Sequence, residues 1–235
     1  RLYRNKRTLE YATAEAYDPR IVASLHHLGK EQLSLAVKGI PLPTGASKHA
    51  FLDKRGRDGM SFGTHENYLV RKSIARVDYV CGMGGYLASR PIAFGTGWFS
   101  PDRQLYCSSR APLITQLVST STIYDRDLAQ LRQEPLLPQH LEDRYDRFHY
   151  IGSEVNASSG LTAVKVGSMM LMLSMVEASW LGLKALRLAD PIAALQAWNA
   201  EPWTVLQTDS GQAVSAPEMQ CRCLEVAEQF LRQAS

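Results

Sequence analysis

The fold of this chain is indicated most directly by nine residues, Ser61-Phe62-Gly63-Thr64-His65-Glu66-Asn67-Tyr68-Leu69. They place a histidine, a carboxylate and an amide between a glycine and an apolar run. The glycine allows the backbone to turn sharply just before these polar side chains. Imidazole nitrogen and carboxylate oxygen can bind a divalent metal ion or steer a phosphate group. Such a triplet is also common in solvated surface loops, so the residue types alone allow either interpretation.

The composition describes an ordinary globular protein. With 235 residues, of which 45% are hydrophobic, the chain can bury a sizeable core. Charged residues make up 21% and the net charge is +3 with both signs interspersed, which favours neither disorder nor a nucleic-acid partner. Four cysteines are present, and the closest two, Cys221 and Cys223, are too near each other for a Cys-x-x-Cys site. We expect reduced thiols in a cytoplasmic protein.

The longest apolar run, from Met169 to Leu186, is expected to be a core helix. It contains Glu177 and Lys184, and a membrane span of about 20 residues rarely carries two charges. The chain begins at Arg1 without a methionine or an apolar segment, so we expect no signal peptide, and residues that precede this start are expected to be missing.

Local patterns predict an extended segment followed by several helices. Asp18-Pro19 provides an N-cap and a proline at the first helical position, which predicts a helix over 19–37. Asp190-Pro191 and Pro217 mark two later helix starts in the same way. The expected elements are an extended segment over 1–16, an exposed loop over 44–60, helical or mixed structure over 71–88, a turn at 95–97, a short strand at 106–108, one long buried helix over 161–186, and helices over 191–199 and 216–233.

Several further segments, taken together with the stretch at 61–69, form an ordered set of motifs along the chain. They are Arg1-Leu2-Tyr3 with Glu10-Tyr11-Ala12-Thr13-Ala14-Glu15, then Ser108-Ser109-Arg110-Ala111, Arg132-Gln133-Glu134-Pro135, the run 145–156 and the run 161–168. In residue type and order these segments resemble the Pup ligase and depupylase family, carboxylate–amine ligases related to glutamine synthetase. Tyr3 and Glu10 are seven positions apart, which is the depupylase-like spacing and favours that branch.

The resemblance implies an α+β fold with a curved antiparallel sheet that cradles ATP and magnesium and carries helices on its outer face. It implies a single domain over residues 1–235 that lacks the first strand and the small C-terminal domain of the family. On this resemblance, either a second chain supplies the missing strand, or this chain is a fragment, or the site is incomplete. The implied partner is a small protein modifier, Pup-like, or a peptide, with no role for nucleic acid or a membrane.

The same resemblance implies ligands for magnesium. Glu10 corresponds to a magnesium ligand, and Tyr3 is its neighbour in the same coordination shell. His65 corresponds to a second ligand for metal or phosphate, and His149 is a further candidate. Two plainer interpretations remain open, in which Glu10 is an edge-strand carboxylate and His149 is an ordinary half-buried histidine.

Two arginines are implied to bind the nucleotide. Arg110 and Arg132 correspond to residues that hold phosphate oxygens, a role that suits the planar guanidinium group. The alternative for each is an ordinary surface salt bridge.

At one position this chain departs from the family pattern in a way that concerns catalysis directly. Where the family has an aspartate that acts as base or nucleophile, this chain has Asn5. An amide cannot accept a proton as a carboxylate does, and loss of a general base typically costs on the order of 10²- to 10⁴-fold in rate. The leading hypothesis is an ATP-dependent ligase or amide hydrolase acting on a small modifier. The alternatives are a catalytically impaired relative that binds nucleotide or partner as a regulatory subunit, and a fragment without activity.

Overall fold

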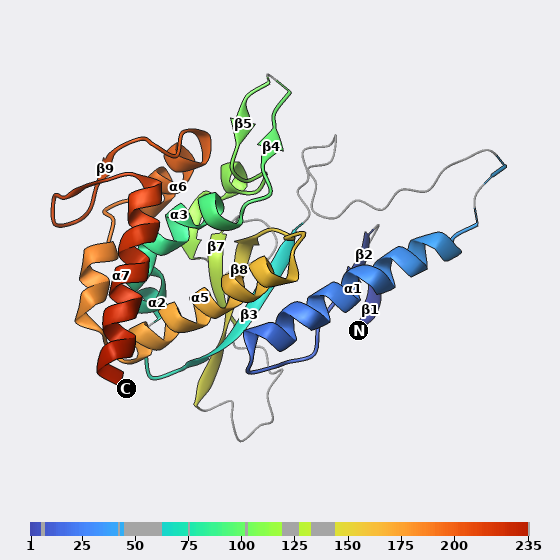
Figure 1. Ribbon diagram of the computed structural model, residues 1–235, viewed down its shortest axis with the longest axis horizontal. Coiled ribbons are helices and arrows are strands. Elements are labelled where there is room, and N and C mark those ends of the chain that lie inside the picture. The colour runs from blue at the N-terminus through green and yellow to red at the C-terminus, as the bar shows by residue number, and fades with distance from the viewer. Residues whose placement is uncertain are drawn as a thin grey trace. The chain divides into compact units, whose positions relative to one another are not determined.

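The computed structural model describes residues 1–5, 8–41, 43–44, 63–74, 76–101, 103–118, 127–132 and 144–234. The chain divides into two compact units. Figure 1 labels the helices and strands of these units. The first contains Arg1–Leu52 and Asn156–Met169, and the second contains Asp53–Val155 and Met170–Ser235. The α5 helix (Ser159–Glu177) begins among residues of the first unit and ends among residues of the second.

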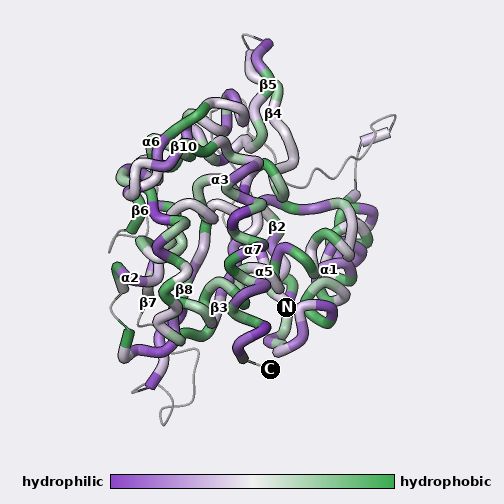
Figure 2. The backbone as a smooth tube through the Cα atoms, turned by 60° about the vertical axis from the view of Figure 1, so that its left-hand side comes forward, coloured by the Kyte–Doolittle hydropathy of each residue, from purple (hydrophilic) through white to green (hydrophobic). Residues whose placement is uncertain are grey.

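The first unit opens with a β-hairpin followed by a long helix. Strands β1 (Leu2–Asn5) and β2 (Thr8–Tyr11) pair antiparallel, with Tyr3 opposite Glu10. Helix α1 (Pro19–Gly39) confirms the prediction of a helix from residue 19 and extends two residues beyond the expected end. Hydrophobic and hydrophilic residues alternate along this helix in Figure 2, as its sequence pattern indicates.

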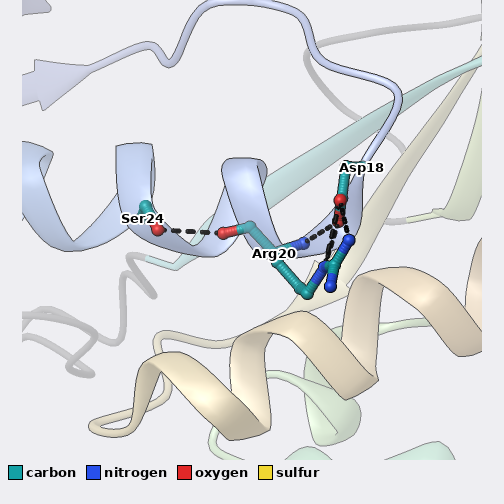
Figure 3. A network of polar contacts seen from close by, with 3 residues as sticks. All are labelled: Asp18, Arg20 and Ser24. Carbon is teal, nitrogen blue, oxygen red and sulfur yellow. Dashed lines mark hydrogen bonds and ion pairs between the residues drawn. The ribbon is translucent and has the colours of Figure 1, made fainter.

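The contacts at the start of α1 explain why its first residue could be predicted from the sequence. The Asp18 carboxylate accepts a hydrogen bond of 2.8 Å from the backbone N–H of Arg20, which satisfies one of the orphan donors at a helix N-terminus. The guanidinium of Arg20 also donates to Asp18, and Ser24 Oγ donates to the Arg20 carbonyl at 3.0 Å (Figure 3). These contacts lie within one or two turns, so a local pattern was enough to find them.

The second unit is built on a four-stranded sheet in the order β3–β8–β7–β6. Strands β3 (Thr64–Arg71), β7 (Asp127–Arg132) and β8 (Tyr145–Ser153) pair antiparallel, whereas β6 (Gln116–Val118) runs parallel to β7. The predicted α+β class is confirmed. The sheet is mixed rather than wholly antiparallel, because of the β6–β7 pair.

Helices and short hairpins complete the second unit. α3 (Gly84–Phe94) packs against α6 (Pro191–Ala200) and α7 (Ala216–Ala234), and it is preceded by α2 (Arg76–Gly82). The predicted segment 71–88 thus contains the end of β3, then α2, then the start of α3. The remaining elements are the hairpin β4 (Trp98–Phe99) and β5 (Leu105–Tyr106), the hairpin β9 (Leu206–Gln207) and β10 (Ala213–Val214), and the 3₁₀ helices η1 (Ala111–Leu113) and η2 (Leu181–Leu186).

Several sequence predictions can be compared with these bounds. The helices expected over 191–199 and 216–233 are confirmed by α6 and α7. The strand expected at 106–108 starts and ends earlier, at Leu105–Tyr106. Most of the predicted loop over 44–60 lies outside the described residues. Among those that are described, α5 is long and apolar enough to cross a membrane, a property that core helices share, and 44% of its apolar window is buried inside the protein.

The prediction of one long helix over 161–186 was wrong. α5 ends at Glu177, because Ser179 adopts a left-handed conformation with φ of 52°. The Trp180 N–H donates to the Met175 carbonyl and the Ser179 N–H donates to the Val176 carbonyl, each at 2.9 Å, which is the Schellman arrangement that ends a helix. The apolar spacing continues beyond this stop because the following η2 helix also buries leucines, so periodicity alone does not reveal the break.

Candidate functional site

A pair of histidines lies on one face of the four-stranded sheet. In the register of β3 and β8, Asn67 is opposite His149, so His65 is the diagonal neighbour of His149 on the same face. Their ring centroids are 5.0 Å apart. His65 is exposed, whereas His149 is 7% exposed, more deeply buried than the half-buried alternative expected. We call His65, Asn67, Arg147 and His149 the polar face of the sheet.

Arg147 strengthens this polar face by donating to Asn67 Oδ1 at 3.3 Å across the strand pair. Gln130 of β7 lies opposite His149, so imidazole and amide groups form a row across three strands. Such a row supplies hydrogen-bond donors and nitrogen ligands suited to a phosphate group or a metal ion. The local reason is strand alternation, which directs His65 and Asn67 to one side of β3 and Glu66 to the other.

Arg110 lies beside the starting end of β3 and the final end of β8. Its Nε donates to the Ile151 carbonyl at 2.8 Å, which attaches the side chain to β8. The phosphate-binding role of Arg110 and its surface salt-bridge alternative both stay predictions. A Cβ added to Gly63 would lie 2.7 Å from Arg110 Cδ and 2.8 Å from the Ser153 carbonyl. Glycine is therefore required here for space, and the arginine side chain lies directly against the residue that precedes β3.

In the first unit, the hairpin brings Tyr3 and Glu10 together. The Tyr3 hydroxyl donates to Glu10 Oε2 at 2.8 Å, and this hydrogen bond is the main reason that the pKa of Tyr3 is raised. Both groups offer oxygen, the ligand type that magnesium prefers. Within the residues that the structure describes, no group of three or more His, Cys, Asp or Glu side chains could hold a metal ion. Magnesium usually keeps several waters and binds through one or two carboxylates, so the chemistry of this pair is compatible with the predicted ligand role, which stays a prediction.

For two of the predicted site residues, Asn5 and Arg132, the structure describes only the backbone. Their backbones are placed at the ends of β1 and β7, where Asn5 is opposite Thr8 and Arg132 is opposite Arg147. Their predicted roles stay predictions.

The opposite face of the sheet carries a buried ion pair that sequence analysis missed. Arg90 of α3 is 2% exposed and its Nη2 donates to Glu66 Oε2 at 2.8 Å. The guanidinium carbon lies 4.6 Å from the ring centroid of Tyr150, and the Tyr86 hydroxyl accepts from Arg90 Nε at 3.2 Å. Burial raises the pKa of Tyr150 to about 12, so this phenol stays protonated at neutral pH.

A sequence signal for this pair did exist. Arg90 is the single charged residue in α3, whose residues are almost all buried, and a charge in such a helix usually has a buried partner. Glu66 is the partner, and it belongs to the His-Glu-Asn triplet, whose residue types alone allowed either a ligand-binding site or a solvated loop. The structure divides the triplet, because the glutamate points into the core while the histidine and amide lie on the polar face.

Glu154 is the second missed residue. It is 2% exposed and accepts hydrogen bonds from Thr96, Ser108 and Ser109. It lies in the run 145–156, which resembles a family motif. The sequence feature that could have singled it out is an acidic residue two positions before Asn156.

The comparison with known proteins decides the family. The family model described as Pup-ligase protein matches residues 1–235. The chain belongs to the Pup-ligase family. It is 34% identical to a Pup–protein ligase of Bifidobacterium animalis subsp. lactis, over 94% of this chain and 47% of the relative. It is 27% identical to a depupylase of Acidothermus cellulolyticus, over 98% of this chain and 47% of the relative.

Solved structures agree with this assignment. The Pup ligase PafA in complex with ADP matches with a TM-score of 0.80 and 26% identity, over 99% of this chain and 52% of that chain. The complex between Pup and its ligase PafA matches with a TM-score of 0.75, also at 26% identity, over 99% of this chain and 48% of that chain. This chain thus spans about half the length of the relatives that it matches. Both ligases and a depupylase are among them, so the depupylase-like branch stays a prediction.

Proposed function

We propose that this chain forms the nucleotide-binding part of an ATP-dependent enzyme that joins or cleaves an amide bond on a small Pup-like protein modifier. Membership of the Pup-ligase family supports the reaction class. Relatives of similar fold have been solved with ADP and with Pup, which supports a nucleotide and a protein modifier as ligands. The observation that carries the proposal is the histidine pair on the polar face, with Arg110 fixed beside the same two strands.

The proposed roles follow from the chemistry of each group. Arg110 and Arg132 bind phosphate oxygens through their N–H groups, and His65 with His149 binds a phosphate or a metal ion at the polar face. Glu10 is a carboxylate ligand for magnesium, and Tyr3 orients it through their hydrogen bond. When bound, magnesium neutralises negative charge on the phosphates of ATP, and this favours attack by a carboxylate on the terminal phosphate.

The test is calorimetric ATP binding with and without magnesium, together with phosphate release in the presence of a Pup-like protein. We expect magnesium-dependent binding that His65→Ala weakens by at least about tenfold. His27→Ala is the matched control, because His27 lies on the exposed surface of α1 and pairs with Glu31 there. If the two variants bind ATP with equal affinity, His65 is not part of the nucleotide site. If the parent protein does not bind ATP, the proposal is overturned.

The substitution of Asn5 for the family aspartate favours one second candidate, a catalytically impaired relative that still binds nucleotide. The same experiment separates the two. Binding accompanied by phosphate release and modifier turnover supports the enzyme, whereas binding without any turnover supports the impaired relative.

A further inference from the structure

Glu154 is a buried carboxylate to which no role has been given above. It directly follows β8, and its Oε1 accepts hydrogen bonds from Ser108 Oγ at 3.0 Å, Ser109 N at 2.8 Å and Ser109 Oγ at 2.7 Å. Its Oε2 accepts from Thr96 N at 2.8 Å and from Thr96 Oγ1 at 3.1 Å. One carboxylate therefore connects the end of β8 to the turn after α3 and to the segment before η1.

This network leads to the backbone of Arg110. Ser108 Oγ donates its proton to Glu154, so its lone pairs accept from the N–H groups of Arg110 at 3.1 Å and Ala111 at 3.2 Å. The Arg110 side chain donates to the Ile151 carbonyl, three residues before Glu154. The side chain of this arginine is thus attached to Ile151 of β8, and its backbone is linked through Ser108 to Glu154, which directly follows β8.

The space beside Glu154 is too small for a ligand. The cavity that Glu154 lines with Arg90, Tyr150 and neighbouring residues has a volume of about 10 Å³. That is roughly the lower limit for a single water molecule. A nucleotide does not fit in this cavity, so a role for Glu154 in nucleotide binding would pass through the protein groups that it holds.

We infer that Glu154 is a positioning residue, which fixes Arg110 in the orientation that binds a nucleotide phosphate. This inference rests on the proposed role of Arg110. A guanidinium binds phosphate through paired, planar hydrogen bonds, so its contribution depends on a fixed orientation. Loss of a partner that orients a ligand-binding side chain typically costs 10- to 100-fold in affinity.

The test is a double-mutant cycle on ADP affinity, measured by calorimetry. Glu154→Gln keeps the size of the side chain but presents an NH₂ group to donors, so we expect ADP affinity to fall about 10- to 100-fold. In the Arg110→Ala background, the same change is expected to have no further effect, because its influence passes through Arg110. Asp146→Asn is the matched control, since it neutralises a different buried carboxylate, which lies in β8, and should leave the affinity unchanged.

A second variant covers the case in which Glu154→Gln does not fold. Ser108→Ala removes the hydroxyl that links Glu154 to the Arg110 backbone and leaves the Ser109 and Thr96 donors in place. It should give the same non-additive loss. Additive losses in the Arg110→Ala background, or unchanged affinity of the single variants, would overturn the inference alone. Failure of the parent protein to bind ADP would overturn the proposed function and with it this inference.

Discussion

At the scale of single residues, two arginine–glutamate pairs of the same chemistry differ in how deeply they are buried. Arg90 and Arg71 each pair with a glutamate. The Arg90–Glu66 pair is almost completely buried, whereas Arg71 is 63% exposed beside Glu177. Removing one member of a buried pair leaves an uncompensated charge in the core, whereas a surface pair is screened by water.

Arg90→Ala is therefore expected to lower the free energy of unfolding by about 3–5 kcal/mol, since it leaves Glu66 buried without its cation. Arg71→Ala is the control and should cost roughly 0–1 kcal/mol. Urea denaturation of both variants measures the difference. Equal losses would show that the buried pair is no more important than the exposed one.

Glu218 provides a prediction for pH. The backbone N–H and hydroxyl of Ser215 each donate to Glu218 Oε2 at 2.7 Å, and these bonds hold the pKa of Glu218 below its ordinary value of 4.5. Because the folded-state pKa is lowered, the stabilisation is present above pH 4.5 and is lost as pH falls through the lower folded-state value. We expect Glu218→Gln to lower Tm near neutral pH and to match the parent in strong acid. A difference in Tm that persists at about pH 2 would contradict this origin.

At the scale of elements, the stop after α5 depends on one strained residue. Ser179 occupies the left-handed region, where a side chain costs roughly 1–2 kcal/mol relative to glycine. Since Ser179 has the position that glycine usually takes in a Schellman motif, Ser179→Gly should raise the free energy of unfolding by about 1 kcal/mol.

Ser174→Gly is the matched control, because Ser174 is an exposed serine within α5. A glycine inside a helix is destabilising by roughly 0.5–1 kcal/mol, so the two serine-to-glycine changes should have opposite signs. Thermal unfolding of both variants tests this, and a loss of stability in Ser179→Gly would show that the helix stop is not under strain.

At the scale of the whole molecule, this chain spans about half the length of the relatives that it matches. Asn5→Asp restores a carboxylate where the family has its base. If the rest of the site is intact, amide turnover in the presence of ATP and modifier should rise by about 10²-fold or more, with ATP affinity unchanged. Gln207→Glu makes the same chemical change at an exposed residue of β9 and should have no effect. Unchanged turnover by Asn5→Asp, with ATP binding intact, would mean that more than a base is lacking.

The sequence by itself determined the family and most helix starts. The Asp18-Pro19 and Asp190-Pro191 starts were found correctly, because an N-cap bonds to the backbone only two or three residues away. The order of the motifs indicated the α+β class and the Pup-ligase family, and both are confirmed. Information that lies in a short stretch of chain, or in the order of several stretches, needs no knowledge of packing.

Only the tertiary structure decided which polar residues meet. The pairing of β3 with β8 brings His65 beside His149, and the packing of α3 brings Arg90 to Glu66. Strand register decides the first contact, and a shift by one residue would turn every side chain to the other face. Helix packing decides the second. Such contacts join residues that are far apart in the chain, and for that reason the glutamate of the His-Glu-Asn triplet could not be separated from its neighbours until the fold was known.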